Sequence, residues 1–230
     1  MPDRDRPLLA VLIDADNVPA KHAANIMREV ASIGEPALRR VYGDWSNPHL
    51  KAWKDPIHAL GLVAHQETSN TTGKNASDIG LVIDAMDILH SGKFNGFVIV
   101  SSDSDFTALV NRLREDGLEV IGIGEEKTNS ALRNVYNRFI LVENLDRDTD
   151  ESKAQTRNPK EALGLVKNAM NKIDTSDEWY SLSAIGQTIR AAHPDFDPRT
   201  YGHAKLSQLM QAIPKLEYRA DAHGEVRLKP

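Results

Sequence analysis

The chain has 230 residues, of which 40% are apolar, with no cysteine and a formal net charge of −5. This length allows one large domain or two smaller ones, and the lack of cysteine excludes disulfides, thiolate metal sites and a cysteine nucleophile. The acidic balance argues against a protein coated in positive potential. No segment is long or apolar enough to cross a membrane and no signal-peptide pattern is present, so we expect a cytoplasmic protein.

Short β-rich runs alternate with longer helical patterns from residue 8 to about residue 144. The predicted strands cover residues 8–13, 37–42, 61–66, 97–101, 118–123 and 139–142. The predicted helices cover residues 20–32, 50–60, 77–89, 105–116 and 129–136. This alternation, with continuous apolar strands, is typical of a parallel sheet covered on both faces. We therefore expect an α/β domain built on a doubly wound, mainly parallel sheet.

A second, smaller domain is expected after a linker. Residues 146–159, DRDTDESKAQTRNP, hold almost no large apolar residue, so they cannot bury enough surface to fold alone. Beyond them, helical patterns cover residues 160–173, a segment starting at Ser181 or Ser183, and residues 201–212; two short strands follow around a DAHG turn. The predicted organisation is a domain at 1–145, a linker at 146–159 and a winged-helix-like α+β domain at 160–230.

Carboxylates gather where the predicted strands of the first domain end. Asp14 and Asp16 follow the first strand, Asp103 and Asp105 follow the fourth, and Asp78 starts a helix. Ligands of open α/β sheets bind outside the carboxyl ends of the strands. If the first and fourth strands are neighbours, three separate segments deliver carboxylates to one cleft.

Clustered carboxylates raise one another's pKa unless cations intervene, and Mg²⁺ or Mn²⁺ is the natural occupant because these hard ions take oxygen ligands. We expect the metal ligands and catalytic residues to be Asp14, Asp78, Asp103 and Asp105. A lone Asp after a strand is more often a turn former or helix cap, and Asp105 is either a ligand or the N-cap of the next helix. Asp84 lies about 120° around the helix from Asp78, which favours either contact with a metal ligand or a role in helix packing, and Asp87 is expected in solvent.

Three ordered motifs resemble the NYN domain: IDADN with Asp14 and Asn17, TTGKNASDIGLVIDAMD with Lys74 and Asp78, and VSSDSDF with Asp103 and Asp105. Members of that family, whose bacterial branch is called LabA-like (DUF88), are PIN-like, metal-dependent ribonucleases. The resemblance covers roughly residues 8–143. It implies that the four aspartates form the acidic site, that Asn17 is a polar partner and that Mg²⁺ or Mn²⁺ is the cofactor.

The C-terminal part is similar to a LOTUS domain, also called OST-HTH, from residue 179 through residue 227. The residues that carry the likeness are WYSLSAIGQTIRAAHPDFDPRTYGHAKLSQLM and the strand pair LEYRADAHGEVRL. The resemblance implies RNA binding or docking of a protein partner. The combined expectation is a metal-dependent endoribonuclease with a C-terminal binding module.

Two other functions remain open. DADNV, residues 14–18, fits the D-x-D-x-[TV] start of haloacid-dehalogenase-like phosphatases, in which Asp14 would attack phosphorus and Asp16 would act as general acid. No cap insertion and no clear lysine motif accompany it, which favours the nuclease. The other alternative is an RNA-binding adaptor whose acids bind metal but turn over little.

Several residues near the predicted cleft are expected to contact RNA, which we expect to be single-stranded. Trp45 follows the second strand and is suited to stack a base. Lys74 is expected at the cleft rim, and Lys127 and Thr128 open a helix whose N-terminus suits phosphate, with Thr128 as N-cap. GIGEE lacks both the Walker and the dinucleotide fingerprints, so no nucleotide cofactor is expected.

Overall fold

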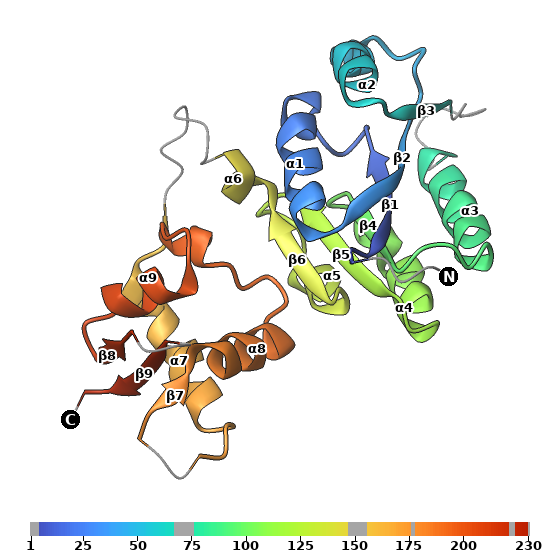
Figure 1. Cartoon of the computed structure of the whole chain (residues 1–230). Coiled ribbons are helices and arrows are strands. Elements are labelled where there is room, and N and C mark those ends of the chain that lie inside the picture. Colours follow the sequence, from blue (N-terminus) through green and yellow to red (C-terminus); the bar gives the residue numbers. More distant parts are fainter. Residues whose placement is uncertain (1–4, 67–75, 147–155, 176–177, 221–223, 230) are drawn as a thin grey trace. The chain divides into compact units, whose positions relative to one another are not determined.

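The structure is a computed structural model that describes residues 5–66, 76–146, 156–175, 178–220 and 224–229 (Figure 1). The chain divides into two compact units, Met1–Ser152 and Lys153–Pro230, each with its own core. Within the described ranges, no helix has both the length and the apolar character that spanning a bilayer requires.

The first unit is built on a six-stranded sheet in the order β3-β2-β1-β4-β5-β6, in which every neighbouring pair is parallel. Its strands are β1 (Leu8–Asp14), β2 (Glu35–Gly43), β3 (Val63–Gln66), β4 (Gly96–Val100), β5 (Glu119–Gly124) and β6 (Arg138–Leu141). The central strand β4 is buried at every position, as a continuous apolar run covered on both faces must be. The predicted α/β fold is confirmed.

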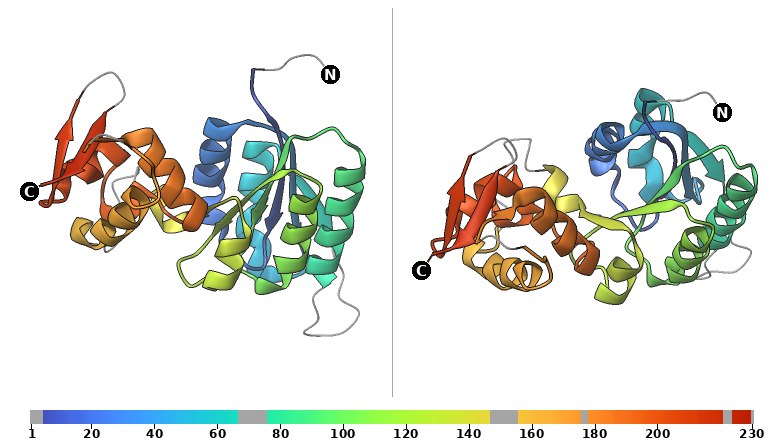
Figure 2. Two further views of the ribbon diagram at one scale, coloured as in Figure 1. Left: turned by 90° about the horizontal axis from the view of Figure 1, so that it is seen from below. Right: turned by 60° about the horizontal axis from the view of Figure 1, so that its bottom comes forward.

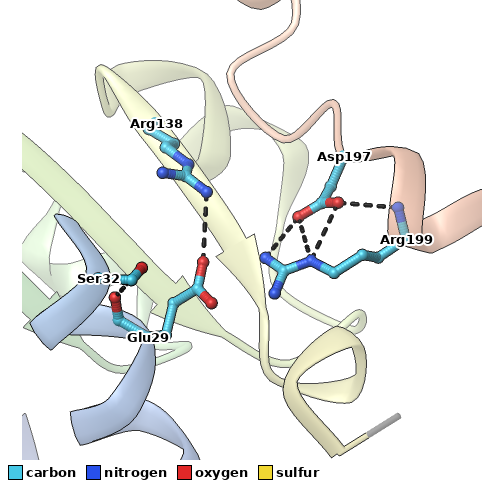
Figure 3. A network of polar contacts seen from close by, with 5 residues as sticks. All are labelled: Glu29, Ser32, Arg138, Asp197 and Arg199. Atoms are coloured by element: carbon cyan, nitrogen blue, oxygen red, sulfur yellow. Dashed lines mark hydrogen bonds and ion pairs between the residues drawn. The ribbon is translucent and has the colours of Figure 1, made fainter. Parts of the chain in front are cut away.

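Helices cover both faces of this sheet (Figures 1 and 2). The core on one face includes side chains of α1 (Ala23–Ile33) and α6 (Val142–Leu145), with α2 (Lys54–Leu60) packed against it. The core on the other face includes side chains of α3 (Ala76–His90), α4 (Thr107–Glu115) and α5 (Ser130–Val135). At the sheet edge, Arg138 of β6 lies 3.3 Å from Glu29 of α1, and the Ser32 hydroxyl donates to the Glu29 carbonyl (Figure 3).

Three predicted helices begin with a 3₁₀ turn before the α-helix starts. These turns are η1 (Ala20–His22), η2 (Pro48–Trp53) and η3 (Ser104–Phe106). In η2, Asn47 caps the turn by accepting from the His49 N–H, and proline occupies the first position, where its missing N–H costs nothing. Gly61, at φ +60°, ends α2 in a left-handed conformation, so β3 starts at Val63 and not at the predicted residue 61.

The second unit contains a three-stranded antiparallel sheet in the order β7-β9-β8 and helices that share a core with it. Its elements are η5 (Pro159–Ala162), α7 (Leu163–Met170), β7 (Tyr180–Ser181), α8 (Leu182–Ala192), η6 (Pro198–Tyr201), α9 (Leu206–Ala212), β8 (Leu216–Arg219) and β9 (Glu225–Leu228). The predicted strand pair is present as β8 and β9; the two-residue strand β7 was not predicted.

Local capping explains how the helices of this unit differ from the prediction. Ser181 starts α8 by accepting from the Ala184 N–H, which settles the choice between the two serines. The predicted helix over residues 201–212 is wrong in its first half, because Gly202 at φ +80° ends η6 and α9 starts only at Leu206. Before that turn, Asp197 binds the Arg199 guanidinium at 2.7 Å (Figure 3).

A polar anchor fixes α3 to the sheet. The Asp84 carboxylate accepts hydrogen bonds from the Arg40 guanidinium and the Tyr42 hydroxyl, both on β2. Tyr42 is fully buried, and burial together with the bond to Asp84 raises the pKa of its phenol, which therefore stays protonated and donates. Asp84 has the packing role expected for it, and Asp87 is exposed.

Removing this anchor should destabilise the first unit. We expect Asp84→Ala to lower the free energy of unfolding by about 2–3 kcal/mol, because the buried Tyr42 hydroxyl loses its acceptor. Asp87→Ala, an exposed change on the same helix, should stay within about 0.5 kcal/mol of the parent. Urea unfolding followed by tryptophan fluorescence measures both, since two of the three tryptophans, Trp45 and Trp53, lie in this unit. Equal losses in the two variants would contradict the anchor.

Candidate active site

Strand order brings the predicted acidic segments to one edge of the sheet. β1 and β4 are direct neighbours, with Ile13 opposite Val100, so Asp14 and the segment after β4 leave the sheet side by side. Helix α3 packs on one face of this sheet and carries Asp78 in its first turn. The condition on which the sequence argument depended, adjacency of the first and fourth strands, is confirmed.

Asp14 is the last residue of β1 and is 1% exposed. Its Oδ1 accepts from the backbone N–H groups of Asp16 (3.1 Å) and Asn17 (3.3 Å). Its Oδ2 accepts from Asn17 Nδ2 (2.7 Å) and from the Ser101 hydroxyl (2.8 Å). Burial raises the pKa of Asp14, while the bonds from Asn17 and Ser101 act in the opposite direction. The carboxylate is thus held in one orientation at the sheet edge.

Ser101 is the site residue that the sequence analysis missed. Its fully buried hydroxyl donates to Asp14 and accepts from the Asp103 N–H at 3.1 Å, so it joins the two acidic segments. In the run VSSDSDF only its position distinguishes it, since it is the serine that immediately follows the buried strand. That position was the available signal.

The segment after β4 arranges its own carboxylates through a cap. Asp103 is the N-cap of η3, and its Oδ1 accepts from the Asp105 N–H at 2.9 Å. Asp105 is exposed in the first turn of η3 and is not its N-cap. Of the two roles predicted for Asp105, the N-cap is therefore wrong, and the role of ligand stays a prediction. Asp103 is half-buried. Ser101 links it to Asp14, because the Ser101 hydroxyl bonds both the Asp14 carboxylate and the Asp103 N–H.

Electrostatics shows that the aspartates act on one another. The pKa of Asp78 is raised from 3.8 to about 6, first by burial and then by the charges of Asp14, Asp103, Asp105 and Asp16. Like charges this close favour protonation or a bound cation. Asp16, which the nuclease interpretation treats as peripheral, contributes the smallest of these effects.

The donor set suits a hard divalent cation. Every candidate ligand is a carboxylate oxygen, and a cation would relieve the repulsion that raises the pKa of Asp78. In the part of the chain that the structure describes, no three acidic or histidine side chains converge closely enough to enclose an ion by themselves. Mg²⁺ does not need such a cage, because it keeps several waters and is commonly held by one or two carboxylates together with substrate phosphates.

The residues predicted to contact substrate differ in accessibility. Asn17 is exposed beside Asp14, which it holds. Trp45 is half-buried; its indole N–H donates to the His65 carbonyl at 2.8 Å, and its backbone N–H donates to the Gln66 side chain. Lys74 lies outside the described residues.

The loop after β5 contains the other two residues predicted to contact substrate, Lys127 and Thr128. Lys127 has a side chain 75% exposed, with its Nζ 2.5 Å from Glu125 Oε2. Thr128 is only 4% exposed, and its hydroxyl has no hydrogen-bond partner among the described residues. The prediction that Thr128 caps the following helix is wrong: α5 starts one residue later, and the side chain of Asn129 accepts from the Ala131 N–H at 2.9 Å.

Comparison with known proteins divides the chain into two domains. Residues 8–143 match the family model of the NYN domain, and residues 154–227 match that of the OST-HTH/LOTUS domain. Among curated proteins, none matches the chain. A crystal structure of a protein of unknown function from Vibrio parahaemolyticus is similar to it, with 20% identity and a TM-score of 0.49, over 60% of this chain and 94% of that one.

The raised pKa of Asp78 predicts that, in metal-free buffer, this residue lowers the stability of the folded state by an amount that depends on pH. The unfolded carboxyl ionises near pH 3.8 and the folded one near pH 6, so between these values the folded state holds the extra proton and loses stability as pH rises. We expect Asp78→Asn to melt at a higher temperature than the parent by a few degrees above about pH 6.5, and by progressively less towards pH 4.

Thermal unfolding in EDTA across this pH range measures the difference, and the exposed Asp87→Asn on the same helix is the matched control. A gap between Asp78→Asn and the parent that does not change with pH would contradict the electrostatic origin.

Proposed function

The chain belongs to the NYN domain family, and from that membership we propose that it is an endoribonuclease that uses Mg²⁺ or Mn²⁺ to hydrolyse RNA phosphodiester bonds. The observation that carries the proposal is the convergence of aspartates from three segments at the carboxyl edge of the sheet, whose charges raise the pKa of Asp78. A site that gathers carboxylates from three segments is suited to cations and, through them, to the phosphates of a substrate.

In this proposal Asp14, Asp78 and Asp103, helped by Asp105, hold the cation. The ion would supply Lewis-acid chemistry, favouring ionisation of water and neutralising charge on the phosphate. Asn17 and Ser101 keep Asp14 oriented through the bonds at 2.7 and 2.8 Å, so this ligand needs no rearrangement when RNA arrives.

Substrate contacts complete the proposed mechanism. Lys127 and Lys74 are proposed to contact RNA phosphates, Trp45 to stack a base, and Asn17 to contact the substrate beside Asp14. The side chain of Thr128 is buried, so we propose that Thr128 contributes to substrate binding indirectly, by holding the loop that carries Lys127. Water adds across the P–O bond in line with the leaving oxygen, which departs as the free hydroxyl end of one product strand.

The second unit is proposed to bind RNA and so to bring substrate to the first, consistent with its OST-HTH/LOTUS match. Two of its arginines are engaged with carboxylates: Arg199 binds Asp197, and Arg227 binds Glu217 and Glu178. Arginines already paired with carboxylates are less available to neutralise phosphates, so we expect this unit to bind a defined RNA feature or a protein partner and not duplex nucleic acid in general.

An RNA-binding adaptor with little turnover is the second candidate function. The observation that favours it is that, over the described residues, no three carboxylates converge around one point. Cleavage activity separates it from the nuclease.

Cleavage of end-labelled single-stranded RNA tests the proposal directly. With Mn²⁺ or Mg²⁺ we expect cutting that EDTA abolishes and that Asp14→Asn lowers by at least about 100-fold, because the oriented ligand is lost. Asp16→Asn should cut like the parent, since Asp16 only borders the cluster. Loss in both variants would favour the phosphatase chemistry, in which both aspartates react. RNA binding by a folded parent that does not cut would favour the adaptor.

Two substitutions of Trp45 test base stacking. We expect Trp45→Ala to weaken binding of single-stranded RNA in EDTA by about tenfold, which is within the usual range for loss of one stacked base. Trp45→Phe keeps an aromatic face and gives up only the indole N–H bond to His65, so it should bind nearly as the parent does. Fluorescence anisotropy of labelled RNA measures both. Equal weakening in the two variants would assign Trp45 to loop structure instead of stacking.

A further inference from the structure

A groove of about 530 Å³ lies beside the aspartates on the α1 and α2 side of the first unit. Three segments line it: residues 15–21 after β1, residues of η2, and Glu125 and Lys127 after β5. Its volume falls within the range of small-ligand sites, about 300–1,000 Å³. The mechanism proposed above uses only two of its lining side chains, Asn17 and Lys127.

The lining of this groove combines apolar and charged side chains. Pro19 and Ala52 line it with exposed apolar side chains, whereas Leu50 and Trp53 are almost fully buried where they line it. The exposed Lys21, His49 and Lys127 line it from three different segments, together with Asp16 and Glu125. A flat ring with an attached, charged backbone matches this combination, because the ring can cover the apolar surface while the backbone meets the lysines.

Hydrogen bonds join the walls of the groove to the segments that carry the aspartates. Asn17, on one wall, donates its side-chain N–H to Asp14 at 2.7 Å. Glu125, on the opposite wall, donates its backbone N–H at 2.9 Å to the hydroxyl of Ser102, which immediately precedes Asp103. The segments that line the groove are therefore hydrogen-bonded to those that carry Asp14 and Asp103.

We propose that this groove binds one nucleoside of single-stranded RNA, the residue flanking the phosphate at the aspartates. The base covers the exposed apolar lining at Pro19 and Ala52, and the adjoining phosphates contact Lys21, His49 and Lys127. The Lys127 side chain is 75% exposed, and its Nζ lies 2.5 Å from Glu125 Oε2, a pairing that a phosphate would have to share or replace. The position of this nucleoside relative to the cut bond rests on the proposed function, but its binding does not require catalysis.

Filling the groove tests the proposal. Ala52 lines the groove and is exposed, so Ala52→Trp occupies it without entering the core. Ala59 is an exposed alanine of the following helix α2 and does not line the groove, so Ala59→Trp is the matched control. Lys21→Glu is a second variant that changes only a charge at the rim.

The probe is single-stranded RNA containing 4-thiouridine, irradiated in EDTA with the full chain, followed by mapping of the cross-linked peptides. We expect cross-links within residues 15–21 or 48–53 in the parent and in Ala59→Trp, reduced about tenfold in Ala52→Trp and severalfold in Lys21→Glu. Cross-links that map elsewhere in the parent, or that persist in Ala52→Trp, would overturn the proposal.

Cleavage assays on the same variants separate this inference from the nuclease proposal. Metal-dependent cleavage without cross-links in the groove would overturn the groove alone. Cross-links in the groove of a parent that never cleaves RNA would support the groove and overturn the nuclease.

Discussion

The hydrogen bonds that hold Asp14 determine how the rest of the site is arranged. A buried carboxylate at the end of a parallel strand is costly unless donors surround it, and here Asn17 and Ser101 supply them from two segments. Because Ser101 also accepts from the Asp103 N–H, the donor that satisfies Asp14 simultaneously positions a second acid. One small hydroxyl therefore couples the stability of β1 to the geometry of the neighbouring loop.

The parallel sheet and the gathering of acids at its edge were predictable from sequence, because both follow from short-range signals. Continuous apolar runs mark buried strands, and the residues after them must emerge at the carboxyl edge. The α/β prediction succeeded for that reason, and Asp14, Asp78 and Asp103 are brought into electrostatic contact.

Features that depend on partners distant in sequence were not predictable. Ser101 looks like any serine after a strand until β1 is placed beside β4. Asp84 could be excluded from the acidic face by helix geometry, but its partners Arg40 and Tyr42 lie more than 40 residues away. The division at Gly202 was missed for a local reason: the helical pattern of apolar residues continues across a glycine whose left-handed conformation ends the turn.

The anchor at Asp84, in the middle of α3, has a consequence for the first turn of that helix. Asp78 lies six residues before Asp84, about 9 Å along a helix that rises 1.5 Å per residue. The bonds from β2 to Asp84 fix the position of the helix along its axis, and they thereby determine how close Asp78 lies to the other aspartates. Any ligand that binds Asp78 and is favoured by that position must, by linkage, tighten the helix against β2 by the same free energy. Strand β2, which contributes no acid to the cluster, therefore takes part in the affinity of the site.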